Sequence, residues 1–126
     1  MRPSILIAVC DSYLAGIYGR KFERSGWDVV VSETLEDAER RLGKMQPSIL
    51  LIETDCNVDV AEDIRRLRKM PTLQRTKIVV LAPTGDRERI ISAKEAGASA
   101  YLLAGHFVPQ EAVTKMKRLI SNEKTL

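Results

Sequence analysis

Side chains that could bind a metal ion, or could react, follow several short apolar segments of the chain. Cys10 and Asp11 follow one such segment, Glu53 follows a second and His106 follows a third. Carboxylate oxygens suit a hard cation such as Mg²⁺, whereas thiolate and imidazole groups suit a softer metal or thiol redox chemistry. In an open parallel sheet, ligands bind outside the carboxyl ends of the strands. These residues would therefore meet at one site if the apolar segments are parallel strands.

Five apolar segments rich in Ile, Val and Leu predict five strands. Their apolar residues are continuous and do not alternate with polar ones, which is typical of strands covered on both faces. The segments lie at 5–9, 29–31, 49–52, 78–81 and 101–103. Stretches of helical length separate or follow them, at 12–25, 34–45, 59–70, 86–96 and 109–122. Because parallel neighbours need a crossover, this alternation predicts an α/β fold, a three-layer αβα sandwich with a mainly parallel sheet.

Single residues mark the ends of the predicted helices. Ser12 and Thr34 are predicted N-caps, and Pro109 suits a first helical turn. Gly26 and Gly97 stand where helices should end.

Composition favours one folded domain. The chain has 126 residues, of which 44% are hydrophobic and 29% charged, and it has no apolar run near the roughly 18 residues that span a bilayer. We expect one compact domain over 1–122 and a frayed tail over 123–126, where a second domain would attach. The net charge of +3 is spread in clusters, such as that of Arg65, Arg66, Arg68 and Lys69, which are typical of solvated helix faces. We therefore expect neither membrane insertion nor direct nucleic-acid binding.

Cysteine content and motifs restrict the chemistry further. The two cysteines form no disulfide framework and match no zinc-finger spacing, so we expect a reducing compartment and a cytoplasmic location. The chain contains no G-x-S-x-G, Walker A or G-x-G-x-x-G motif. We therefore predict neither enzymatic activity nor a nucleotide cofactor.

Six short segments carry a resemblance to a known family. They lie at 5–8, 25–30, 46–52, 64–68, 77–81 and 95–103. Their order and spacing resemble the response-regulator receiver domain, the CheY-like module of two-component signalling and phosphorelays. The resemblance covers about residues 4–120 and implies a five-stranded parallel sheet in the order 2-1-3-4-5 with five helices.

The resemblance also implies a phosphorylation pocket, from which this sequence departs. In the family an acidic pair helps to hold Mg²⁺, an Asp accepts the phosphoryl group, a Thr or Ser bonds to it and a Lys pairs with its charge. The corresponding positions here are, in order, Val9 with Cys10, Glu53, Ala82 and Ala104, with Asp11 one place beyond the pair. The chain thus resembles an atypical receiver, or pseudo-receiver, that binds Mg²⁺ weakly or not at all and is not phosphorylated at Glu53.

Loss of phosphoryl chemistry leaves protein interaction as the expected function. In the family, contacts with partners and twin copies use the surface of the fourth helix, the fifth strand and the fifth helix. The matching residues here are Arg87, Ile90, Lys94, Tyr101, Val108 and Lys115. This mixed basic and apolar surface suits an acidic partner or a second copy of the chain.

Two alternatives stay open. The domain could still be phosphorylated by an unconventional route, or Cys10, Cys56 and His106 could form a metal or redox sensor. Glu53 itself has two interpretations, a mimic of the phosphorylated state or a solvated residue at the sheet edge. We also expect a trans peptide bond between Ala104 and Gly105, because a cis bond without proline costs about 2.5–4 kcal/mol.

Overall fold

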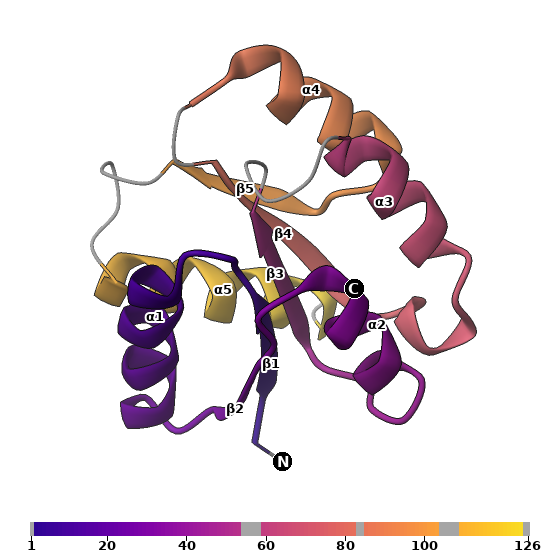
Figure 1. Ribbon diagram of the computed structural model, residues 1–126. Helices are drawn as coiled ribbons and strands as arrows, with labels where there is room; N and C mark the ends of the chain where they lie inside the picture. Colours follow the sequence, from indigo (N-terminus) through magenta and orange to yellow (C-terminus); the bar gives the residue numbers. More distant parts are fainter. Residues whose placement is uncertain (1, 54–58, 83–84, 104–108, 125–126) are drawn as a thin grey trace.

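A computed structural model describes residues 2–53, 59–82, 85–103 and 109–124, with side chains to residue 121. It contains a five-stranded sheet in the order β2-β1-β3-β4-β5, and every neighbouring pair is parallel (Figure 1). The strands are β1 Ser4–Ala8, β2 Asp28–Val31, β3 Ile49–Glu53, β4 Lys77–Ala82 and β5 Ala100–Leu103. The predicted fold and strand order are confirmed.

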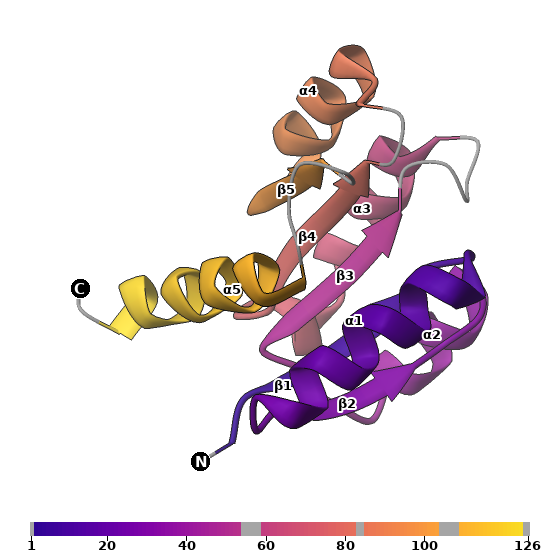
Figure 2. The same ribbon diagram turned by 90° about the vertical axis from the view of Figure 1, so that its left-hand side faces the viewer.

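Helices cover both faces of this sheet. They are α1 Ser12–Arg24, α2 Leu35–Leu42, α3 Val60–Arg68, α4 Arg87–Ala96 and α5 Pro109–Lys124, with a short 3₁₀ turn, η2, at Pro71–Leu73. Helices α1 and α5 pack on one face, and α2, α3 and α4 pack on the other (Figure 1; Figure 2). Helix α5 is longer than the predicted 109–122. No helix in the described ranges is both long and apolar enough to cross a bilayer.

Burial on both faces explains the continuous apolar strands. In β1, Ile5 and Ile7 join the core under α1 and α5, whereas Leu6 joins the core under α2, α3 and α4. All three side chains are fully buried. Because successive side chains of a strand point to opposite faces, both sets of positions must be apolar when helices cover both sides.

The helix ends agree with the sequence signals except at the first helix. Asp11, not Ser12, is the N-cap of α1, and its Oδ1 accepts hydrogen bonds from the backbone N–H groups of Tyr13 at 2.9 Å and Leu14 at 3.3 Å. Ser12 is instead the first helical residue. The prediction failed because two adjacent residues both have capping side chains, and only the backbone conformation selects between them.

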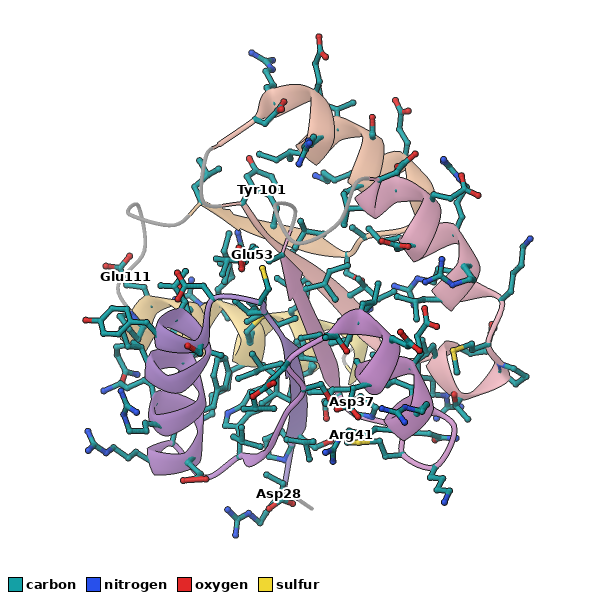
Figure 3. All side chains as sticks on the ribbon, in the orientation of Figure 1. Asp28, Asp37, Arg41, Glu53, Tyr101 and Glu111 are labelled. Carbon is teal, nitrogen blue, oxygen red and sulfur yellow. The ribbon has the colours of Figure 1, made fainter. Side chains whose placement is uncertain are left out.

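The other caps follow the prediction. Thr34 Oγ1 accepts a hydrogen bond from the N–H of Asp37 at 3.0 Å. The Asp37 carboxylate in turn accepts a hydrogen bond from Arg41, which lowers the pKa of that carboxyl (Figure 3). At the end of α4, Gly97 has φ of +124°, a conformation that side-chain-bearing residues rarely adopt.

Candidate functional site

The carboxyl edge of the sheet brings the predicted pocket positions together. Glu53 is the last residue of β3, and Ala82 is the last residue of β4 beside it. Val9 and Cys10 directly follow β1, which is the other neighbour of β3. Figure 3 shows Glu53 at this edge of the central strand.

Glu53 is a buried carboxylate, with only 4% of its surface exposed. Its two oxygens, Oε1 and Oε2, lie 3.8 and 3.9 Å from the Sγ atom of Cys10. The interpretation of Glu53 as a solvated residue at the sheet edge was therefore wrong. The Glu53 side chain is buried because it lies at the end of β3, between β4 and the residues that follow β1. Burying a carboxylate is costly, so its immediate neighbours decide what it can do.

Cys10 is exposed and disulfide-bonded. Its sulfur therefore has no proton, and its approach to Glu53 is a contact and not a hydrogen bond from a thiol. The expectation of reduced cysteines was wrong for Cys10. The chain has one other cysteine, Cys56, which lies outside the described residues.

Asp11 has a structural task at the same edge. Its Oδ1 atom holds the first turn of α1 through the two capping hydrogen bonds, at an exposed position. A carboxylate at a helix N-terminus is favoured by the helix dipole as well as by these bonds. A metal ion bound by Asp11 would have to share the carboxylate with the two backbone N–H groups that it caps.

The remaining pocket positions of the described chain are apolar. Val9 is 1% exposed and packs in the core under α1 and α5, and Ala82 is also 1% exposed. Ala104, His106 and the Ala104–Gly105 peptide bond lie outside the described residues, as does Val108. Within 2–53, 59–82, 85–103 and 109–121, no group of three or more His, Cys, Asp or Glu residues is arranged to hold a metal ion.

A second candidate site lies on the surface formed by α4, β5 and α5, which we call the α4–β5–α5 face. Here Tyr101 lies on β5 with two ammonium groups near its ring, Lys94 Nζ at 5.7 Å and Lys115 Nζ at 5.5 Å from the ring centroid (Figure 3). Lys115 Nζ also donates a hydrogen bond to the backbone oxygen of Tyr101 at 3.0 Å. Cation–π contacts of this kind fix the two lysines beside the aromatic ring.

One predicted residue of this face is not at the surface. Ile90 is only 8% exposed and is one of two buried residues of α4, whereas the next residue, Ile91, is 46% exposed. Adjacent isoleucines differ by about 100° around a helix, so only one of them can face the sheet. Ile91 thus replaces Ile90 as the apolar residue that this helix exposes.

Sequence comparison finds relatives but no matching family model. The chain is 25% identical over 125 residues to the phosphate regulon transcriptional regulatory protein PhoB of Rhizobium meliloti (strain 1021), covering 98% of this chain and 55% of that protein. It is 24% identical over 98 residues to the uncharacterized transcriptional regulatory protein YvcP of Bacillus subtilis (strain 168), covering 78% of this chain and 40% of that protein. The chain thus spans about half the length of the curated relatives it matches.

Solved structures share the fold over nearly the whole chain. A candidate response regulator from Chloroflexus aurantiacus J-10-fl superposes with a TM-score of 0.86 and 26% identity, covering 96% of this chain and 99% of the other. The response regulator (signal receiver domain) from Bermanella marisrubri gives a TM-score of 0.84 at 24% identity, covering 95% and 99%. The chain thus shares its fold with response-regulator receiver domains and is similar to them in sequence.

The described part of the pocket at the carboxyl edge has few side-chain oxygens. Mg²⁺ requires near-octahedral oxygen coordination, usually from one or two carboxylates together with several waters and phosphate oxygens. The described receiver pocket offers Asp11, which caps α1, and Glu53, which is buried beside a disulfide sulfur. Val9 and Ala82 supply no side-chain oxygen.

Reasoning from the sequence missed two features of this chain. The sequence argument expected no disulfide because the chain has only two cysteines, whereas Cys10 is disulfide-bonded. Arg68 was assigned to a solvated basic cluster, but its guanidinium turns inward and bonds four oxygens. Neither pattern is visible in composition alone.

Proposed function

We propose that this receiver domain acts in two-component or phosphorelay signal transduction as a phosphorylation-independent protein-interaction module. The observation that carries the proposal is the pocket at the carboxyl edge, where Glu53 is buried against the Cys10 sulfur. A phosphoacceptor needs to be open to a phosphodonor and to a bound cation, and the burial of Glu53, which is 4% exposed, argues against both. In this proposal Mg²⁺ binding is weak or absent, and the domain has no catalytic activity of its own.

The α4–β5–α5 face supplies the binding surface in this proposal. Exposed cations lie on both of its helices, Arg87 and Lys94 on α4 and Arg118 on α5. A surface pocket of about 540 Å³ lies on α5. It is lined by Gln110, Glu111, Thr114, Lys115 and Arg118. Exposed Ile91 adds an apolar contact. Because complementary charge steers association and selects partners, the face suits a protein with an acidic surface.

The place of the domain in a larger protein is a further part of the proposal. The two matched relatives are transcriptional regulatory proteins, and the domain spans 55% and 40% of their lengths. We propose that the receiver domain works in the cytoplasm beside an output domain that follows residue 122. The interaction at the α4–β5–α5 face would then convey the signal in place of a phosphoryl group.

Changing the charge of Lys94 should remove the partner. In Lys94→Glu, the carboxylate replaces one of the two ammonium groups at Tyr101 and repels an acidic surface. Immobilised protein, without any phosphodonor, should retain an acidic protein from an extract of its own cell, with the amount bound falling at least tenfold in Lys94→Glu. Quantitative mass spectrometry of the bound fraction measures this, and raised salt should weaken the wild-type interaction as well.

Arg24→Glu is the matched control, because Arg24 is an exposed cation in the last turn of α1, as Lys94 is in α4. The control should retain the partner. An equal loss in both variants, or no loss in Lys94→Glu, would show that the partner does not use this face. Sedimentation of the wild type and of each variant measures the oligomeric state. A dimer of the wild type that dissociates in Lys94→Glu but not in Arg24→Glu would show that the face binds a second copy of the chain.

A further inference from the structure

Positive charge is concentrated in two stretches of the chain that the proposed function does not use. Residues 40–52 and 64–82 together contain nine of the 20 lysines and arginines but none of the 17 aspartates and glutamates. Each stretch runs from the end of a helix, α2 or α3, through a connection at the amino edge of the sheet and into β3 or β4. Whether the two stretches form one charged surface depends on how the fold places these connections.

Hydrogen bonds join the two connections. Thr72 Oγ1, on η2, donates to the backbone oxygen of Leu42 at 2.9 Å, and Thr76 Oγ1 donates to the backbone oxygen of Pro47 at 2.8 Å. The turn η2 therefore lies against the end of α2, although about 30 residues of chain separate them in sequence. The cations of both stretches thus share the surface around η2.

Three of these cations, Lys44, Lys69 and Arg75, form what we call the η2 patch. All three are exposed, and none of them forms an ion pair with another residue of the described ranges. Like charges on one surface repel each other, so the patch works against the compact state of the free domain. A bound polyanion would relieve this repulsion.

The composition of the surface distinguishes between kinds of polyanion. Stable interfaces between proteins have an apolar centre. The large hydrophobic side chains that the described structure exposes are Tyr13, Val31 and Ile91, and none of them belongs to 40–52 or 64–82. A partner of this surface must therefore be held by charge and polar contacts. Double-stranded DNA, with one negative charge per roughly 1.7 Å of helix axis, is held in this way.

We propose that the η2 patch binds the phosphate backbone of double-stranded DNA without regard to sequence. Exposed Gln46 and Gln74 lie in the same two connections and supply side-chain N–H groups that can donate to phosphate oxygens. The sequence alone predicted no direct nucleic-acid binding because its cations fall in separate clusters, and the fold unites two of these clusters. The proposal does not depend on the α4–β5–α5 face or on its partner.

Fluorescence anisotropy of short labelled duplexes tests the proposal. Two duplexes of unrelated sequence should bind equally at low salt. The logarithm of the association constant should fall with the logarithm of salt concentration with a slope of about −3, since each neutralised phosphate contributes roughly −0.9. In the triple variant Lys44→Gln, Lys69→Gln, Arg75→Gln, affinity at low salt should fall at least tenfold and the slope should approach zero.

The matched control is Arg20→Gln, Arg24→Gln, Lys117→Gln. It removes three exposed cations from α1 and α5, which cover the opposite face of the sheet, and should bind DNA as the wild type does. No binding at low salt, an equal loss in both triple variants, or a strong preference for one duplex would overturn the proposal. Poly-glutamate is the probe for an acidic protein, and tighter binding of poly-glutamate than of DNA with the same total charge would also overturn it.

Discussion

Replacing Arg68 with methionine should lower the free energy of unfolding by about 2–4 kcal/mol. The guanidinium of Arg68 donates to three backbone oxygens, those of Gly97 at 3.0 Å, Leu73 at 2.9 Å and Thr76 at 2.8 Å, and to Ser99 Oγ at 3.2 Å. It thereby ties α3 to the segments that lead into β4 and β5. Methionine can fill the space of the stem, but it leaves these oxygens without their donor.

The environment of Arg68 explains why the effect is large. Burial lowers the pKa of its guanidinium, and the four oxygens that it bonds are all uncharged. The site therefore stabilises a cation through hydrogen bonds, each of which leaves an unsatisfied group when it is lost. A lysine at this position has fewer donors and no fork geometry, so Arg68→Lys should recover only part of the lost stability.

Urea denaturation measures the effect of Arg68→Met, with Arg65→Met as the control. Arg65 belongs to the same helix, is exposed, and pairs with Glu62 at 3.4 Å across one turn. Exposed pairs of this kind contribute little, so Arg65→Met should change stability by less than about 0.5 kcal/mol. If both variants lose the same small amount, the hydrogen bonds of Arg68 do not join these elements in solution.

Replacing Trp27 with alanine should cost about 3–5 kcal/mol, the range for a fully buried aromatic side chain. Trp27 has no exposed surface, and its ring meets Phe22 edge-on with 4.9 Å between centroids. Alanine would leave a cavity between α1 and the start of β2, and close packing prevents the neighbours from filling it completely. Thermal or urea unfolding of the variant measures the loss.

Trp27→Phe is the informative control, because the indole Nε1 of Trp27 is buried with no hydrogen-bond partner within the described structure. Phenylalanine keeps a ring against Phe22 and removes this unsatisfied donor, which offsets part of the lost volume. We expect Trp27→Phe to lose less than half of what Trp27→Ala loses. An equal loss in the two variants would mean that Nε1 has a partner in solution.

Both of these residues lie at the amino edge of the sheet, opposite the candidate site. Trp27 directly precedes β2, and the partners of Arg68 directly precede β4 and β5. Trp27 and the bonds of Arg68 thus stabilise the fold near one edge of the sheet, whereas the candidate pocket lies at the other. Such a division allows the pocket to change its chemistry without loss of the scaffold.

The sequence predicts the fold well, because the sheet imposes its pattern on every strand. Strands covered on both faces must be continuously apolar, as Ile5, Leu6 and Ile7 are, and helical crossovers must separate them. Thr34 and Gly97 mark helix ends through local chemistry, so they are also readable. These features depend on neighbours in the chain or on simple periodicity.

Prediction from local sequence patterns fails at residues whose environment is set by distant parts of the chain. Arg68 follows two exposed arginines and was grouped with them, although it lies four residues after buried Ile64 and hence on the same side of α3. Ile90 and Ile91 are chemically identical, and only the contact with the sheet distinguishes the buried one. The burial of Glu53 depends on β1 and β4 beside it, which no local pattern records.

The proposal that this domain does not use phosphoryl transfer is tested most directly by its mass after exposure to a phosphodonor. Protein incubated with acetyl phosphate and Mg²⁺, in both disulfide and reduced forms, should keep its unmodified intact mass. A receiver domain with the acidic pair and acceptor aspartate, treated in parallel, should gain one phosphate. A gain of one phosphate by this chain, mapped to Glu53 or to any other residue, would contradict the account.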